Sequence, residues 1–95
     1  MNSGSTYHIH VTLDWLNVNN NIEWCKEHNM YWYILSSRDQ CEFIAVKYTQ
    51  SDPVLKARNL LGKLKESGLT VCKVIIKSHI NDVPVKNILY FEFDR

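Results

Sequence analysis

Hydrophobic and polar residues alternate near the start of the chain with the period of two that a β-strand imposes. The alternation covers residues 7–13 and places four apolar side chains on one face of the predicted strand: Tyr7, Ile9, Val11 and Leu13. The opposite face receives three polar side chains: His8, His10 and Thr12. We expect the apolar face to join a hydrophobic core. The polar face gathers two imidazoles and a hydroxyl on one side of a single strand.

Four later segments are rich in β-branched and aromatic residues, which favours strands. These segments are residues 30–35, 41–49, 69–80 and 88–93. The short polar link 36–40 predicts that the second and third strands form an antiparallel hairpin. The segment 81–84, which contains Pro84, is expected to end the fourth strand.

A short amphipathic segment, residues 22–28, predicts the first helix. Three asparagines at positions 19–21 precede it and are typical of a turn and a helix cap. Ile22 and Cys25 lie three residues apart and share the predicted apolar face of this helix.

A longer helix is predicted to begin at Pro53, after the capping residue Asp52, and to end before Gly68. Its apolar stripe consists of Val54, Ala57, Leu60, Leu61 and Leu64. Gly62 lies inside the helix, where it costs about 1 kcal/mol relative to alanine. We interpret this glycine as a sign of close packing against the sheet.

The predicted order is strand, helix, strand, strand, helix and strand, followed by an extra C-terminal strand. This is the split βαβ pattern of ferredoxin-like domains. We therefore expect an α+β, ferredoxin-like βαββαβ sandwich, with an antiparallel sheet and two helices on one face. In that topology the first strand lies between the third and the fourth. The chain length suits one domain, residues 1–95, with residues 1–6 disordered.

The face of the sheet without helices is expected to carry the polar side of the first strand. On the fourth strand, Lys73, Lys77 and His79 alternate with other residues and are expected to point the same way. Because the fourth strand runs beside the first in this topology, these side chains become neighbours of the polar ones on residues 7–13. The predicted binding residues are His8, His10, Thr12, Lys73, Lys77 and His79.

The overall charge narrows the classes of partner. A formal net charge of +1 argues against strong attraction to nucleic acid or to an anionic membrane. No apolar run approaches the ~20 residues of a membrane span, and residues 1–6 lack the features of a secretory signal. Cys25, Cys41 and Cys72 form no CxxC pair, and we interpret them as reduced thiols of a cytoplasmic protein.

The open face has two interpretations that involve no chemistry. Polar residues on the exposed side of an antiparallel sheet are the ordinary pattern, so the face can simply be solvated. Alternatively it is an interface for a second copy or a protein partner. Tyr31, Trp32 and Tyr33 cannot all enter one small core, and aromatic residues are enriched at interfaces. The terminal strand 88–93 could also pair edge to edge with another chain.

Two further interpretations involve a ligand. Sheets of this topology can stack RNA bases on aromatic side chains, but strand 41–49 lacks the Lys/Arg-Gly-Phe-x-Phe pattern that marks such domains. His8 and His10 have a spacing compatible with a divalent ion, and His79 could be a third ligand. Because no acidic ligand lies near them in the sequence, we expect neither a metal nor a cofactor.

The segment His10-Val11-Thr12-Leu13 resembles the His-x-Thr-hydrophobic strand motif of 2H phosphoesterases. The resemblance implies that His10 and Thr12 bind and protonate a phosphate, as a histidine can near neutral pH. That family carries the motif twice. The later candidate here, His79-Ile80-Asn81, lacks the hydroxyl, and the chain has about half the length of a two-lobed enzyme.

The ends of the chain resemble an uncharacterised α/β family in which a Tyr-Phe-Glu-x-His strand closes a similar unit. The matching segments are the strand 10–13, the helix exit at Gly68-Leu69 and the final Tyr90-Phe91-Glu92-Phe93. Asp94 stands where that family has histidine. This resemblance implies no activity.

Together these patterns favour a small binding or assembly module over an enzyme. We expect a homodimer or a complex with a protein partner, formed through the open sheet face, and no membrane association. The alternative is a small 2H-like phosphoesterase, or a nucleotide- or RNA-binding protein, that uses His8, His10, Thr12 and His79.

Overall fold

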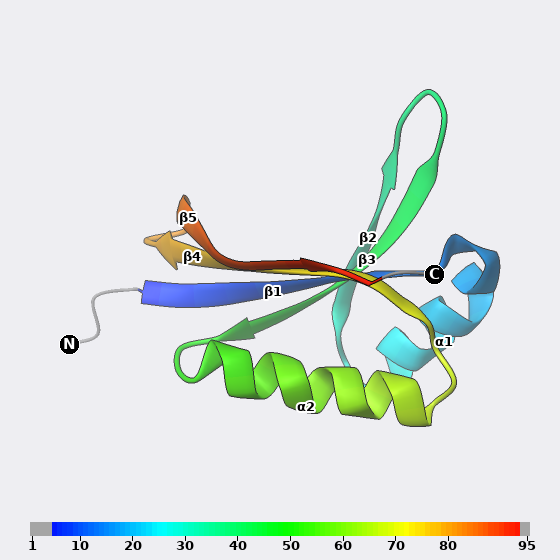
Figure 1. Ribbon diagram of the computed structural model, residues 1–95, viewed down its shortest axis with the longest axis horizontal. Coiled ribbons are helices and arrows are strands. Elements are labelled where there is room, and N and C mark those ends of the chain that lie inside the picture. The colour runs from blue at the N-terminus through cyan, green and yellow to red at the C-terminus, as the bar shows by residue number, and fades with distance from the viewer. Residues whose placement is uncertain (1–4, 94–95) are drawn as a thin grey trace.

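The computed structural model describes residues 5–93, which form an α+β fold (Figure 1). Its strands are β1 (Ser5–Leu13), β2 (Tyr31–Ser36), β3 (Cys41–Thr49), β4 (Val71–Ile80) and β5 (Val83–Glu92). Its helices are the 3-10 turn η1 (Trp15–Asn17), α1 (Val18–Glu27) and α2 (Pro53–Glu66). Within residues 5–93, neither α-helix is long and apolar enough to cross a bilayer.

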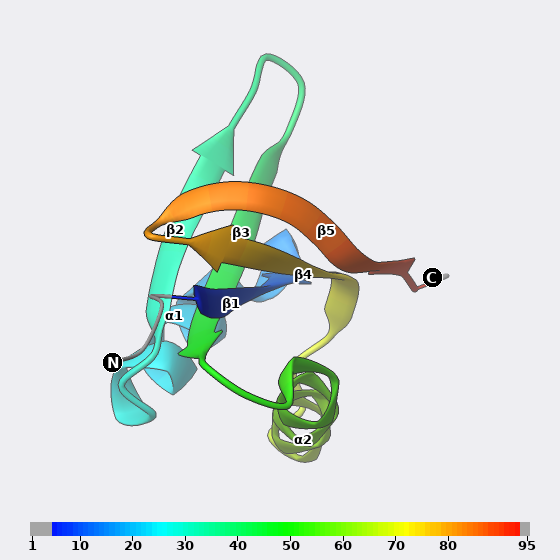
Figure 2. The same ribbon diagram turned by 90° about the vertical axis from the view of Figure 1, so that its left-hand side faces the viewer.

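The strands form one open antiparallel sheet in the order β2-β3-β1-β4-β5. As predicted, β1 lies between β3 and β4, and β5 adds an outer strand beside β4. Both α-helices lie on the same side of the sheet, while the β2–β3 hairpin rises on the opposite side (Figures 1 and 2). The helix-free face is therefore bounded along one side by this hairpin.

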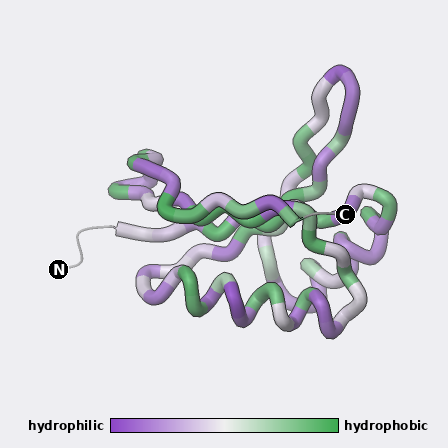
Figure 3. The backbone as a smooth tube through the Cα atoms, viewed as in Figure 1, coloured by the Kyte–Doolittle hydropathy of each residue, from purple (hydrophilic) through white to green (hydrophobic). Residues whose placement is uncertain are grey.

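The hydrophobic core fills the space between the sheet and the helices. Its fully buried side chains include Ile9, Val11 and Leu13 of β1, Phe43 of β3, Ile76 of β4, Cys25 of α1 and Leu64 of α2. Hydrophobic and hydrophilic residues alternate along α2 (Figure 3), as expected of a helix with one buried stripe. Trp24 Nε1 donates to Ser67 Oγ over 2.9 Å and so ties α1 to the end of α2.

The first helix begins at Val18, earlier than the predicted start at residue 22. The asparagines at positions 19–21 lie inside the helix, so their interpretation as a cap is wrong. Asn21 is fully buried, and its Nδ2 donates to the Asp14 carbonyl over 3.0 Å. This buried hydrogen bond outweighs the low helix propensity of asparagine.

The second helix begins at Pro53 and ends before Gly68, as predicted, but Asp52 does not act as a side-chain cap. Asp52 has a left-handed backbone with φ of 48°, and among the described residues its carboxylate makes no capping hydrogen bond. Lys56 instead ties the first turn to the end of β3, where its Nζ donates to Thr49 Oγ1 over 2.9 Å. Gly68 has the positive φ of 79° that a glycine after a helix commonly adopts.

The fourth and fifth strands form a tighter hairpin than predicted. β5 begins at Val83 rather than at residue 88, because Asn81 and Asp82 form a two-residue turn with φ of 52° and 65°. Pro84 is compatible with β5 because this strand lies at the edge of the sheet, where a missing N–H is tolerated.

The start of the chain also departs from prediction. Residues 1–6 are predicted to be disordered, which is wrong for Ser5 and Thr6, because these residues begin β1. Residues 1–4 lie outside the described part of the chain.

The expectation that Gly62 marks close packing is wrong. Gly62 is exposed, and a Cβ placed on it would meet no heavy atom within 4 Å.

We expect Gly62→Ala to raise the free energy of unfolding by about 1 kcal/mol, because alanine loses less backbone entropy in a helix. Urea denaturation measures this change. Gly68→Ala is the matched control and should be destabilising, since φ at Gly68 is 79°. Destabilisation by Gly62→Ala would contradict the placement.

Candidate functional site

All six predicted binding residues belong to the helix-free face of the sheet. In the β1–β4 ladder, His8 lies opposite Lys77, and Thr12 lies opposite Lys73. His79 lies opposite Thr6. Thr6 precedes His8 by two residues and therefore lies on the same face of β1. Because directly opposite residues of an antiparallel pair share a face, the predicted register of these two strands is confirmed.

Four strands of the sheet, β1 to β4, bring aromatic rings together on the helix-free face. We call the set His8, His10, Tyr33, Tyr48 and His79 the histidine–tyrosine cluster. The rings of His8 and His79 stack with their centroids 3.6 Å apart, and Tyr48 meets His8 edge-on at 4.5 Å. His10 Nδ1 lies 3.3 Å from the Tyr33 hydroxyl, within hydrogen-bond distance. The cluster thus links β1, β2, β3 and β4.

The two tyrosines of the cluster are not among the predicted site residues. Tyr48 lies opposite His8 in the β1–β3 ladder, and Tyr33 lies opposite Ile44 in the β2–β3 ladder. Tyr33 and Tyr48 are 40% and 50% exposed, so both rings can be reached from solvent. The sequence signal that could have identified Tyr33 is the alternation along the predicted hairpin, which places Tyr33 on the opposite face from the core residue Trp32.

The buried position of the imidazoles favours their neutral form. The pKa of His10 is lowered from its ordinary value of 6.5 to about 4, mainly by burial and to a smaller extent by the neighbouring charges of Lys77, His8 and His79. Burial also lowers the pKa of His8, and the charge of His79 acts in the same direction. Both His8 and His10 are therefore neutral near pH 7. They offer flat rings and single hydrogen bonds rather than positive charge.

His79 is the most deeply buried member of the cluster, with 5% of its surface exposed. Within residues 5–93, its Nδ1 has no hydrogen-bond partner, and neither has the hydroxyl of Thr6 on the opposing strand. The imidazole of His79 is instead in contact with the ring of His8, on which it stacks.

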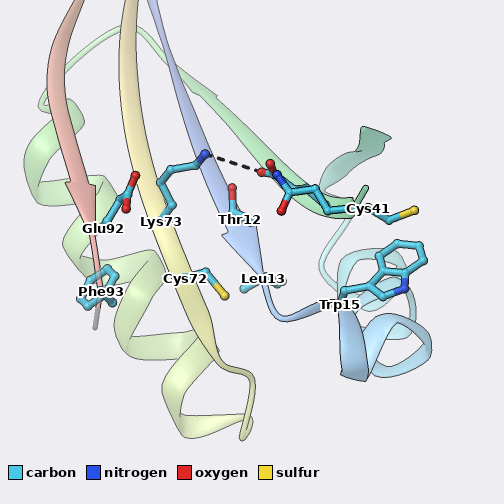
Figure 4. Close-up of a pocket in the computed structure, with 10 residues that line it drawn as sticks. Thr12, Leu13, Trp15, Cys41, Cys72, Lys73, Glu92 and Phe93 are labelled. Atoms are coloured by element: carbon cyan, nitrogen blue, oxygen red, sulfur yellow. Dashed lines mark ion pairs between the residues drawn. The ribbon is translucent and has the colours of Figure 1, made fainter. Parts of the chain in front are cut away.

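Thr12 and Lys73 line a separate hollow at the other end of β1, shown in Figure 4. The hollow has a volume of about 350 Å³, and Trp15, Cys41 and Glu92 also line it. Thr12 is 8% exposed. The predicted binding residues therefore divide into two groups, with His8, His10, Lys77 and His79 at the cluster and Thr12 and Lys73 at this hollow.

The charge of Lys73 is offset by carboxylates. Its Nζ lies 3.6 Å from Glu42 Oε2, the ion pair drawn as a dashed line in Figure 4. Glu92 lies opposite Lys73 in the β4–β5 ladder and lines the same hollow. One ammonium beside two carboxylates leaves no excess positive charge for a phosphate.

Comparison with known proteins gave no match to a protein family, to a curated protein or to a solved structure. The resemblances to 2H phosphoesterases and to the uncharacterised α/β family therefore stay predictions.

A metal site is not evident on this face. Among residues 5–93, no three or more His, Cys, Asp or Glu side chains are grouped so that they could hold a metal ion. The rings of His8 and His10 are 6.2 Å apart between centroids, and His8 is occupied by its stack with His79.

One thiol and two of the tryptophans belong to the hydrophobic core or pack against it. Cys25 is buried in the core, where burial raises the pKa of its thiol to about 11 and makes the reactive thiolate rare at neutral pH. Trp24 is buried and Trp32 stacks on Phe43, whereas Trp15 is 36% exposed beside the hollow.

Proposed function

We propose that the protein is a small binding and assembly module whose histidine–tyrosine cluster binds a segment of a partner protein. The observation that carries this proposal is the cluster itself, in which rings from β1, β2, β3 and β4 contact one another and the two tyrosines remain accessible. Tyr31 is 69% exposed and extends the aromatic surface by an edge-on contact with Tyr48 at 5.6 Å. Exposed aromatic surface of this kind is typical of interaction sites.

The class of fold we propose is ferredoxin-like, with β5 as an added edge strand. Two features support it: β1 lies between β3 and β4, and both helices lie on one side of the sheet. The helix-free face is the surface that this topology leaves open for a partner.

The charges around the cluster favour a protein segment over RNA. A nucleic-acid surface needs several unpaired cations to meet the phosphate backbone. Here His8 and His10 are neutral and Lys73 is offset by Glu42. Lys77 lies opposite His8 and is the cation next to the rings. We therefore expect a partner segment with one aromatic side chain for the rings and one carboxylate for Lys77.

The same surroundings disfavour the phosphoesterase alternative. With a pKa of about 4, His10 carries little proton to donate to a phosphate at neutral pH. Thr12 is nearly buried and lines the hollow around Lys73. His79 stacks on His8 rather than on His10. The 2H resemblance would place three residues around one phosphate: His10, Thr12 and His79. Each of them instead contacts different neighbours.

A selection from random twelve-residue peptides displayed on phage tests the proposal (~5 extended residues at ~3.3 Å each suffice to cross four strands that are ~4.8 Å apart, so such a peptide is long enough). We expect enriched peptides to share an aromatic and an acidic residue. The affinity of a synthetic enriched peptide is then measured by calorimetry. Tyr33→Ala combined with Tyr48→Ala should weaken it about tenfold or more, since each lost aromatic contact contributes on the order of 1 kcal/mol. Leu16→Ala, whose side chain is 87% exposed on η1, is the control and should bind as the parent does.

Three outcomes would overturn the proposal. The first is peptide affinity that the tyrosine variants leave unchanged although circular dichroism shows them folded. The second is tight binding of a uridine decamer at the cluster, which would favour RNA. The third is hydrolysis of a 2′,3′-cyclic nucleotide that His10→Ala abolishes, which would favour the 2H-like enzyme.

A further inference from the structure

The edge strand β5 presents an unusual amount of apolar surface. It is the last strand of the sheet, so one side of its backbone has no partner strand among the described residues. Its exposed apolar and aromatic side chains are Val83, Val85, Ile88, Tyr90, Phe91 and, just after the strand, Phe93. Edge strands with such side chains pair readily with other chains unless something blocks them.

The two halves of β5 differ in how well they are protected against pairing with another chain. The first half contains Pro84 and Lys86, and the β4–β5 register shifts there between Ile76 and Lys77 and again between Ser78 and His79. Proline, lysine and bulges are the features that keep an edge from pairing. The second half, residues 89–93, pairs with β4 in regular register and carries Glu92 as its one charge.

An apolar groove follows the same unprotected half. It has a volume of about 260 Å³ and lies between α2 and β5 on the helix side of the sheet. Val54 and Leu61 of α2 line one wall, and Leu89, Phe91 and Phe93 line the other. Phe91 and Val54 are 54% and 46% exposed, so the helix covers β1 and β4 but leaves β5 open. The unblocked edge and the uncovered groove therefore coincide.

We propose that this surface binds a second copy of the chain, through antiparallel pairing of two β5 strands about a two-fold axis at Phe91. The inference adds a second surface to the proposed function and does not depend on the histidine–tyrosine cluster. Phe93 N donates to Cys72 O over 2.9 Å, so by alternation Leu89, Phe91 and Phe93 bond inward to β4. The backbone groups of Tyr90 and Glu92 then point outward, where a second strand can reach them.

The register centred on Phe91 pairs apolar side chains with apolar side chains on the helix side of the sheet. Residues directly opposite share a face, so Leu89 meets Phe93 of the other copy and Phe91 meets Phe91. Apolar side chains thus meet across the helix-side groove of each copy. A shift that centres the pair on Tyr90 would instead place Phe93 opposite the polar Asn87.

The single charge of the segment also fits this register. Glu92 of one copy lies opposite Tyr90 of the other, so the two carboxylates avoid each other. The Tyr90 hydroxyl already donates to Glu92 within one chain, which shows that the two side chains are compatible partners. Tyr90 and Glu92 are also the residues with outward backbone groups, so each pair can exchange two backbone hydrogen bonds.

Analytical ultracentrifugation of the intact chain tests for the dimer. We expect a concentration-dependent mass that approaches twice the 11.2 kDa of one chain, with micromolar affinity because the paired segment is short. Phe91→Lys should weaken the dimer about tenfold or more, since it places two ammonium groups face to face. Phe91 is half exposed, so the variant is expected to fold, which circular dichroism checks.

A cysteine variant tests the register independently. In Phe91→Cys the two new thiols would face each other at a non-hydrogen-bonded position, where Cα atoms are about 4.5 Å apart and a disulfide can form. We expect mass spectrometry of the oxidised protein to find the peptide containing position 91 linked to itself. Leu35→Cys on β2, the other edge strand, is the matched control and should give no such link.

The outcomes separate this inference from the proposed function. A strict monomer, an unchanged dimer in Phe91→Lys, or a link through position 35 in place of position 91 would overturn it. Loss of the dimer in the double variant of Tyr33 and Tyr48 would also overturn it, because the interface would then be the helix-free face.

Discussion

Replacement of Phe43 by alanine is expected to lower the free energy of unfolding by about 3–5 kcal/mol, the largest stability change that we predict. Phe43 is fully buried on β3, and the Trp32 ring of β2 stacks on it with centroids 5.3 Å apart. Truncation would leave a cavity in the core and remove the contact that holds the base of the β2–β3 hairpin. Urea denaturation followed by tryptophan fluorescence measures the change.

A matched control is Phe91→Ala, studied at a concentration where the chain is monomeric. Phe91 is 54% exposed, so its loss should cost less than about 1 kcal/mol. Equal costs for the two phenylalanines would contradict the assignment of the core. Because Tyr33 follows Trp32 directly, Phe43→Ala should also reduce peptide affinity at the histidine–tyrosine cluster.

Acidification is expected to destabilise the protein through His10. The pKa of this side chain falls from 6.5 to about 4 in the folded state, mainly through burial. Between these values the unfolded chain binds a proton that the folded chain does not, so the free energy of unfolding decreases as the pH falls. The full difference corresponds to about 3 kcal/mol, which is an upper limit because the ring is only partly buried. The contribution is present above pH 6.5 and is lost progressively towards pH 4.

The measurement is urea denaturation at a series of pH values from 7 to 4 (roughly the interval between the two pKa values). In His10→Gln the loss on acidification should be smaller, with the remainder including His8, whose pKa is also lowered by burial. His28→Gln changes a histidine on the C-terminal end of α1, away from the face, and is the control for a histidine substitution that leaves His10 in place. An identical pH profile for the parent and His10→Gln would contradict the neutral state of His10.

The polar and apolar faces of the strands could be predicted from the sequence because the period of two is unambiguous on β1. With β1 placed beside β4, the same alternation brought Lys73, Lys77 and His79 to the face that carries His8. Element boundaries were less accurate where tertiary contacts decide. The buried hydrogen bond of Asn21 extends α1 towards its N-terminus, and the position of β5 at the sheet edge allows Pro84 inside a strand.

The composition of the site could be predicted only in part. Strand alternation identifies which side chains share a face, but it does not say which rings touch. The stack of His8 on His79 joins residues that are not directly opposite, and the curl of the β2–β3 hairpin brings Tyr33 to His10. The lowered pKa of His10 depends mainly on the burial of its side chain, which the sequence does not show either. A sequence gives no direct signal for such contacts, although the exposed tyrosines of a predicted hairpin are a reasonable place to look.

The central claim is that the histidine–tyrosine cluster is the binding surface of the protein. Nuclear magnetic resonance tests it most directly, through chemical shifts and intermolecular Overhauser effects recorded while an enriched peptide is added to the isotopically labelled chain. We predict that the largest changes fall on His8, His10, Tyr33 and Tyr48, with Overhauser effects from the peptide to their rings. Changes confined to the groove between α2 and β5, with these four residues unaffected, would contradict the claim.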